Sequence, residues 1–360
     1  MKFNARLVSA TLALGASAAM FSGCSGSQTP FTPLTPIASG RQPIAPESIA
    51  KVNGPDVISA PGDLVYVASS TGCGFVRSGI CHAMVSVYSY PDGGYRGKWI
   101  DESNGNDVRS HTGGECADNA GHVFVTYTGA SGKILEFAHG ATKPMATLSD
   151  SKGDPFSCSF DPTTGDLAVV TTDHLGGNEL LVYKNASSGR NGIAYSDPNL
   201  TLTNVAYDDN GNAFVDGPSG LAELARDAKS FQKVTLNRTI QSFGSLQWDG
   251  QYLAVTDIGT DDVYRFAIKA NGNGSIGGFV AGYTELGDRS NGKGYNTTRI
   301  TETWVAGNTI VASRMRAGIC DFKCPGSVDV WHYPAGGPAF RNIGGGAIFD
   351  NPSGVAVSAR

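Results

Sequence analysis

The sequence predicts an all-β protein built from repeated small antiparallel sheets. Its 360 residues include 48 glycines but only 16% charged residues, and this composition favours many tight turns over long amphipathic helices. A glycine followed by one residue and a short apolar run also recurs along the chain, as in GDLAVV from Gly165 and GNAFV from Gly211. Such glycines supply the positive φ of a tight hairpin turn, so we expect short strands joined by hairpins.

The first fifty residues stand apart from this pattern. Lys2 and Arg6 precede an apolar stretch too short to span a bilayer, so residues 1–23 are expected to be a signal peptide. The segment ends in FSGC, which resembles the lipobox of bacterial lipoproteins and implies that Cys24 is lipidated. An ordinary secretory signal with an unused thiol is the alternative. Residues 24–50 are rich in Ser, Thr and Pro, and we expect an unpacked tether there.

Residues 51–360 carry a strand repeat that predicts the architecture. The glycine that opens the repeated strand occurs at Gly62, Gly121, Gly165, Gly211, Gly250 and Gly307. Short strands precede these glycines at 115–118, 157–161, 204–208, 245–249 and 302–306. Third strands with an aromatic residue or Leu in fourth place follow at 85–88, 134–137, 180–183, 221–224, 263–266 and 328–331, and weaker fourth strands at 193–197 and 231–236. Four antiparallel strands per unit, repeated about every 40 to 60 residues, predict a six-bladed β-propeller.

The chain ends bear on how such a ring closes. A sixth copy of the first strand, GVAVS at 354–358, ends the chain with no strand after it. It fits the innermost position of the first blade, where pairing of the two chain ends would leave no free sheet edge. Residues 55–60, PDVISA, compete for the same position.

Residues 55–360 resemble the NHL-repeat and YncE-like bacterial propellers, through the phrases DPTTGDLAV, DDNGNAFV and YPAGG. The resemblance implies a fold and leaves the activity open, because six-bladed propellers include enzymes, receptors and scaffolds.

Six cysteines remain beside Cys24, an even number in a chain expected to reach an oxidising compartment. They are Cys73, Cys81, Cys116, Cys158, Cys320 and Cys324. The first two lie in one predicted loop and the last two in another, so pairing within each loop and pairing between the loops both stay open. Zinc is a weaker alternative for CDFKC, which has no second Cys or His pair at finger spacing. Strand parity places Cys116 and Cys158 on facing sides of neighbouring inner strands, which allows either a disulfide or two buried thiols.

The loops on one face of the predicted ring are the first candidate for a binding site. Long connections gather around the channel mouth on that face, and loops on a rigid scaffold commonly carry binding residues. The charged side chains in these loops are Arg77, Arg109, His111, Arg314 and Arg316. They suit a carboxylate, a phosphate or an acidic glycan, although solvated loop charges are the plainer interpretation of each one.

A second candidate site consists of three residues with side-chain oxygen atoms, each at the start of an inner strand in alternate blades. Glu115, Asn204 and Glu302 would surround the channel mouth and could hold Ca²⁺, as in gluconolactonase-like enzymes. Glu115 is one residue out of register with the other two, and three side chains provide fewer oxygens than Ca²⁺ prefers.

These patterns favour a lipid-anchored, monomeric propeller in the bacterial cell envelope that binds a protein or glycan partner without catalysis. A metal-dependent hydrolase or lyase is the alternative. Removing Lys2 and Arg6 with the signal peptide changes the formal net charge from −5 to −7, so no positive field favours nucleic acid.

Overall fold

The computed structural model describes residues 62–71, 82–101, 111–128, 132–150, 153–172, 178–186, 192–272, 274–287, 298–316, 325–346 and 349–360. Apart from one short 3₁₀ turn, η1 (Lys184–Ala186), its regular elements are strands. They are β1 (Leu64–Thr71), β2 (His82–Ser89), β3 (Tyr95–Ile100), β4 (His111–Ala117), β5 (Val123–Thr128), β6 (Lys133–Phe137), β7 (Ala146–Ser149), β8 (Asp154–Phe160), β9 (Leu167–Thr172), β10 (Asn178–Tyr183), β11 (Ile193–Tyr195), β12 (Asn204–Tyr207), β13 (Ala213–Gly217), β14 (Gly220–Leu224), β15 (Gln232–Leu236), β16 (Phe243–Trp248), β17 (Leu253–Asp257), β18 (Asp262–Ala270), β19 (Ile276–Gly287), β20 (Thr298–Ala306), β21 (Thr309–Arg316), β22 (Pro325–His332), β23 (Gly337–Pro338), β24 (Arg341–Asn342) and β25 (Phe349–Ser358). No helix in these ranges is long and apolar enough to cross a bilayer.

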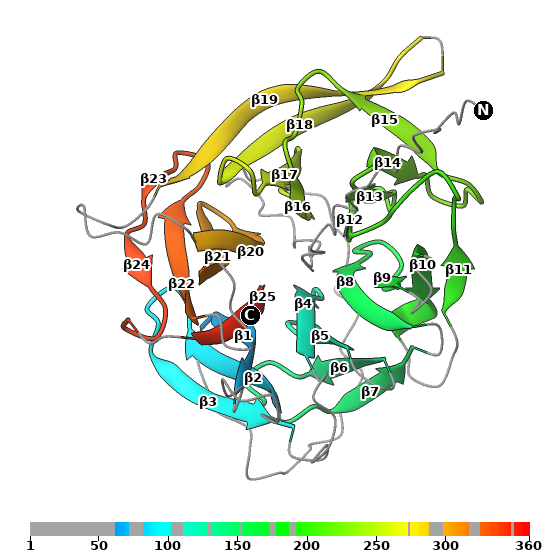
Figure 1. Cartoon of the computed structure of the whole chain (residues 1–360). Helices are drawn as coiled ribbons and strands as arrows, with labels where there is room; N and C mark the ends of the chain where they lie inside the picture. The colour runs from blue at the N-terminus through cyan, green and yellow to red at the C-terminus, as the bar shows by residue number, and fades with distance from the viewer. Residues whose placement is uncertain are drawn as a thin grey trace, which may run out of the picture.

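The strands form antiparallel sets arranged around a central axis (Figure 1). Two sets stand alone as four-stranded sheets, β4-β5-β6-β7 and β8-β9-β10-β11. The runs β12-β13-β14-β15 and β16-β17-β18-β19 are joined where β15 pairs in parallel with β19. The run β20-β21-β22 touches β25-β1-β2-β3 through a short pairing of β22 with β25. The first strand of each set lies nearest the centre of Figure 1 and the last at the rim, which is the architecture of a β-propeller.

Aspartates before the turn glycines explain the recurring sequence pattern. Asp208 Oδ1 accepts the N–H groups of Asn210 and Asn212, each at 2.9 Å, and Gly211 has a φ of 81°. The carboxylate thus holds the turn between β12 and β13, while glycine supplies a backbone conformation that other residues rarely adopt. Asp118 binds the turn between β4 and β5 in the same way, through the N–H groups of Ala120 and His122.

The core lies between neighbouring sheets, so inner strands are apolar on both faces. Every residue of β13 and β17 is buried. The fourth residues of the predicted third strands are also buried, as expected for side chains packed between sheets. They are Tyr88, Phe137, Tyr183, Leu224, Phe266 and Trp331.

The last strand closes the ring by pairing with the first described one. β25 runs antiparallel to β1, from Leu64 opposite Ser358 to Ala68 opposite Gly354. Of the two segments that the sequence left open for this position, GVAVS is the one that pairs with β1, and residues 55–60 lie outside the described part of the chain. β1 then has β25 on one side and β2 on the other, so neither edge of β1 is left unpaired.

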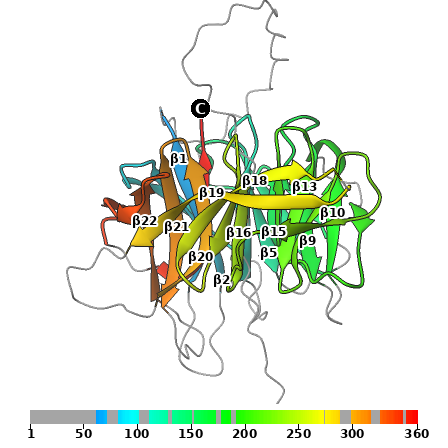
Figure 2. The same ribbon diagram turned by 90° about the horizontal axis from the view of Figure 1, so that it is seen from above.

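One outer strand links three neighbouring sets at the rim. β19 pairs antiparallel with β18, in parallel with β15, and in parallel with β23 at Leu286 and Gly287. Figure 2 shows it running across the side of the ring, at an angle to the strands behind it.

Candidate functional site

The strands nearest the central axis contain β-bulges near the ends where the chain arrives from the preceding set. At each bulge the register of pairing with the second strand of the set shifts. The shifts lie between Thr112 and Glu115, Pro155 and Ser157, Phe243 and Leu246, Ile300 and Glu302, and Asp350 and Gly354. Bulges redirect side chains and backbone groups, so we define this end as the channel mouth and examine the polar groups there.

The carboxylate of Glu302 binds backbone groups of two other inner strands. Its Oε2 accepts the N–H of Val355 on β25 at 2.6 Å and the N–H of Glu115 on β4 at 3.2 Å. Gly354 on β25 leaves room for this arrangement, since a Cβ there would lie 3.0 Å from Glu302 Oε2. Glu302 therefore connects β20, β25 and β4 through charge-assisted hydrogen bonds.

Glu115 lies beside Glu302 and is fully buried. A Cβ on Gly354 would also lie 3.0 Å from Glu115 Cγ, so both glutamates crowd the same point on β25. Neither carboxyl oxygen of Glu115 forms a well-oriented hydrogen bond within the described residues. Burial raises the pKa of Glu115 well above its ordinary value, and the nearby backbone of Ala356 only partly opposes this shift. The side chain therefore favours the neutral acid.

Asn204 forms a different pair, with Asp216 on the adjacent strand β13. The amide Nδ2 donates to Asp216 Oδ1 at 2.6 Å, and the Thr203 hydroxyl donates to the same oxygen at 3.3 Å. Burial raises the pKa of Asp216 well above its ordinary value, while the bonds from Asn204 and Thr203 lower it in part. The sequence did not predict this buried pair of an amide and an acid. The signal that could have indicated it is the Asp in FVDG, which lies near the end of an apolar strand.

Other buried oxygens near the channel mouth also lack hydrogen-bond partners within the described residues. They are Ser69 Oγ, Thr171 Oγ1, Asn204 Oδ1 and Asp216 Oδ2, in addition to the two oxygens of Glu115. Buried polar atoms in folded proteins nearly always have a partner, which is often water or a bound species. The mouth therefore offers buried acceptor atoms to water or a ligand.

The predicted calcium ligands do not form one set in the described part of the chain. Glu115 and Glu302 are brought together, but the contacts of Asn204 are with Asp216 and Thr203. No group of three His, Cys, Asp or Glu residues in the described ranges is arranged to hold a metal. Burial raises the pKa of Glu115, and Glu302 accepts backbone N–H groups of two other strands. The calcium site stays a prediction.

The predicted loop cations have different outcomes. Arg314 is buried, with Nη2 donating to the Leu286 carbonyl at 2.6 Å and its guanidinium 4.9 Å from the centre of the Trp331 ring. This side chain joins β21 to the strand β19 at the rim. His111 and Arg316 lie at ends of β4 and β21, for which the structure gives only the backbone. Arg77 and Arg109 lie outside the described residues.

Cys116 and Cys158 form a disulfide between the inner strands β4 and β8, with Cα atoms 5.7 Å apart. Of the two outcomes that strand parity allows, the structure contains the bond. The predictions for Cys24, Cys73, Cys81, Cys320 and Cys324 lie outside the described residues.

Comparison with known proteins gives a solved structure of similar fold with a TM-score above 0.5, and no activity. No protein-family model matches the sequence, and no curated protein matches it. Among solved structures, a protein of unknown function from Bacteroides caccae matches with a TM-score of 0.54 and 12% identity, over 84% of this chain and 100% of that one. The β-propeller domain of Myceliophteria thermophila Cps50 (Swd1) gives 0.45 and 11%, over 79% and 90%. A chain of a nidogen/laminin complex gives 0.49 and 11%, over 82% and 98%.

Proposed function

We propose that the chain is a lipid-anchored, six-bladed β-propeller of the bacterial cell envelope that binds a protein or glycan partner without catalysis. The six blades would be β25-β1-β2-β3, β4 to β7, β8 to β11, β12 to β15, β16 to β19, and β20-β21-β22 with β24. Their repeats are similar to those of NHL and YncE-like propellers. The proposal of an anchor rests on FSGC at Cys24 and the Ser/Thr/Pro-rich residues 24–50.

The use of Glu302 is the observation that carries the non-catalytic assignment. A carboxylate at a propeller channel is a natural metal ligand or general base, but here its oxygens accept backbone N–H groups of β25 and β4. These hydrogen bonds use the carboxyl group to connect inner strands of two other sets. Glu302 therefore supports a structural role at the channel mouth.

The mouth is the face that we assign to the partner. The connections between second and third strands, and between successive sets, meet there because every set is antiparallel. The buried acceptor oxygens of Glu115, Asn204 and Asp216 lie at the same end. These oxygens are shielded from solvent and suit enclosed water, so the partner would contact the predicted loops around the mouth.

Metal content and thermal melting of the full chain in detergent test the non-catalytic assignment. We expect no stoichiometric divalent ion after purification and the same melting temperature with and without a chelator. A tightly bound ion whose removal lowers the melting temperature would instead support the metal-dependent hydrolase.

An array of cell-wall glycans tests the binding face. Retention of the full chain should fall in Arg109→Ala, a substitution in a predicted mouth loop. It should stay unchanged in Arg96→Ala, whose exposed side chain lies on the outer strand β3. Equal retention of both variants would remove the mouth from the proposal.

A further inference from the structure

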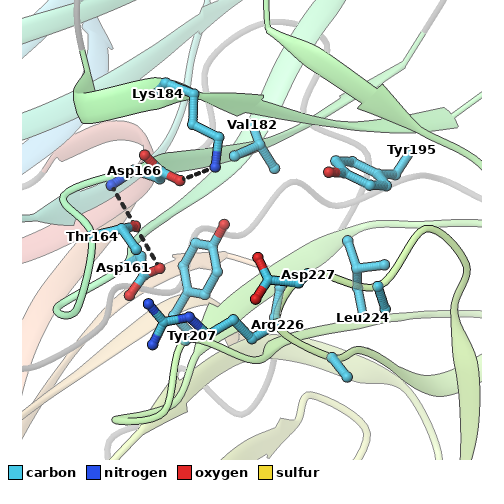
Figure 3. A pocket seen from close by; sticks show the side chains of 14 residues that line it. Asp161, Thr164, Asp166, Val182, Lys184, Tyr195, Tyr207, Leu224, Arg226 and Asp227 are labelled. Atoms are coloured by element: carbon cyan, nitrogen blue, oxygen red, sulfur yellow. Dashed lines mark hydrogen bonds and ion pairs between the residues drawn. The ribbon is translucent and has the colours of Figure 1, made fainter.

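A pocket lies at the other end of the strands, between the sets β8 to β11 and β12 to β15. The hairpin turns after β8 and β12 and the turn after β14 form its walls (Figure 3). These turns lie opposite the channel mouth, because each antiparallel strand reverses direction. The pocket is open to solvent, and its enclosed volume of about 100 Å³ is below the range of about 300 to 1,000 Å³ that is typical of small-molecule sites, so it would hold only part of a ligand.

Tyr207 supplies a hydroxyl that points into this pocket. Figure 3 shows the ring in the middle of the site, with its oxygen directed toward the space between Lys184 and Asp227. The residue is only 5% exposed, and its backbone N–H donates to Ser159 Oγ of the neighbouring set at 2.9 Å. Its hydroxyl therefore reaches the open pocket, where it can donate to water or to a ligand.

Burial and the nearby carboxylates keep the Tyr207 hydroxyl protonated. Burial is the larger cause that raises its pKa, and the charges of Asp161 and Asp166 raise it further. The group is therefore an O–H donor at any physiological pH.

Two aspartates beside the Tyr207 hydroxyl provide hydrogen-bond acceptors, and their carboxylates are held in place by hydrogen bonds. Asp161 Oδ1 accepts both the N–H and the hydroxyl of Thr163, at 2.7 and 2.8 Å. Its Oδ2 accepts one bond, from the Thr164 hydroxyl at 2.7 Å, and so has capacity for another. Asp166 is bound by the Lys184 ammonium at 2.5 Å and by the backbone N–H of Asn185 at 2.9 Å. The Lys184 side chain is half exposed.

The charges around the pocket nearly cancel. Asp161, Asp166 and Asp227 face Lys184 and Arg226, which leaves at most one net negative charge. The three carboxylates would repel an anion, and the ammonium and the guanidinium would repel a small cation. The balance favours an uncharged ligand that both donates and accepts hydrogen bonds.

Apolar surface completes the site. The rings of Tyr195 and Tyr207 and the side chains of Val182 and Leu224 line the pocket beside the charged groups. Sugars combine hydroxyl groups that donate and accept with C–H faces that pack on rings and aliphatic side chains. We propose that this turn-face pocket binds a neutral, polyhydroxylated ligand such as one unit of a glycan. The pocket faces away from the channel mouth, so this proposal stands independently of the binding face proposed above.

Saturation-transfer NMR of the full chain in detergent tests the proposal with defined probes. The neutral probes are glucose, galactose and N-acetylglucosamine, and glucuronate and glycine test the anion and the zwitterion. We expect transfer to at least one neutral sugar and weak or no transfer to glucuronate and glycine. Tyr207→Phe removes one hydrogen bond to the ligand and should weaken the affinity about fivefold.

Tyr183→Phe is the matched control. Tyr183 is equally buried, but its hydroxyl donates to the Ser149 carbonyl at 3.3 Å and does not line the pocket. This variant should bind the sugar as the unmodified chain does. Transfer to none of the neutral sugars, or equal binding by the chain with Tyr207→Phe, would overturn the proposal. Stronger binding of glycine or glucuronate than of the neutral sugars would indicate a charged ligand and would also overturn the proposal.

Discussion

The carboxyl group of Glu115 makes the protein's stability depend on pH. Burial raises its pKa in the folded state, so the folded chain holds a proton that the unfolded chain releases near its ordinary pKa. The contribution to stability is fully present below that ordinary pKa and is lost as the pH rises through the folded-state pKa. Glu115→Gln keeps the size and removes the titration. At pH 8 we expect this variant to be more stable than the unmodified chain by about 1 to 3 kcal/mol, as measured by denaturant unfolding.

The same measurement at pH 4.5 separates titration from packing. Position 115 is then neutral in both folded chains, so their free energies of unfolding should differ much less than at pH 8. Glu285→Gln, an exposed substitution on β19, should follow the unmodified chain at both pH values. If Glu115→Gln had the same effect at pH 4.5 and pH 8, ionisation of Glu115 would not be its cause.

The repeat predicts that Glu115 and Glu302 lie on inner strands, but it does not predict which groups their side chains contact. An inner-strand position beside the channel follows from the repeat, so Glu115 and Glu302 could be predicted to lie near the axis. That Glu302 bonds to Val355 depends on ring closure at residue 354, far away in the sequence. The prediction for Arg314 was wrong in another way. The sequence predicts a loop cation because Arg314 follows an apolar run, but its side chain is buried, where it contacts the Leu286 carbonyl and the Trp331 ring.

At the level of single strands, β25 depends on the missing side chain of Gly354. A Cβ there would lie 2.9 Å from the Gly113 carbonyl oxygen on β4 and 3.0 Å from both glutamate side chains. The backbone oxygen cannot move without shifting β4. Gly354→Ala should therefore lower the free energy of unfolding by about 2 to 3 kcal/mol through overpacking, measured by denaturant titration at a single pH.

Gly282→Ala on β19 is the control for glycine replacement itself. A Cβ at that position would meet no atom within 4 Å, so the change should be close to neutral. Equal destabilisation by both substitutions would show that loss of glycine in a strand, rather than crowding at Gly354, is responsible.

Strands were predictable where apolar pattern and turn chemistry coincide. Asp and Gly mark the hairpins before β9 and β13, and the buried run that follows each turn identifies the strand. Outer strands lack both signals: β11 is three residues with exposed Ile193 and Ala194, and β23 and β24 have two residues each. β19 reaches twelve residues because it pairs with three other strands, and no local pattern predicts that.

Over the whole molecule, neighbouring sets are joined by side chains that bond to the backbone of the next inner strand. Ser157 and Ser159 on β8 accept the N–H groups of Val205 and Tyr207 on β12. Ser245 and Gln247 on β16 do the same for Thr303 and Val305 on β20. These bonds satisfy buried backbone N–H groups along the inner edges of β12 and β20, which lack a neighbouring strand there within the described chain.

The joint between β4 and β8 is covalent, through Cys116 and Cys158. The bond closes a loop with a sequence separation of 42 residues, so it restricts the unfolded chain substantially. Replacing both cysteines by serine should cost about 2 to 4 kcal/mol of unfolding free energy, while the β-sheet circular dichroism signal at 20 °C stays unchanged. The strands remain because their hydrogen bonds lie within each sheet, and only the joint between two sheets is lost.

A reductant separates this bond from the cysteines outside the described residues. Dithiothreitol should lower the melting temperature of the unmodified chain by more than it lowers that of the Cys116→Ser and Cys158→Ser double variant. The difference between the two shifts then measures the bond between β4 and β8, because both chains share every other cysteine. Equal shifts would show that the joint contributes nothing to stability. The channel would then be held by packing and by the hydrogen-bonded joints alone.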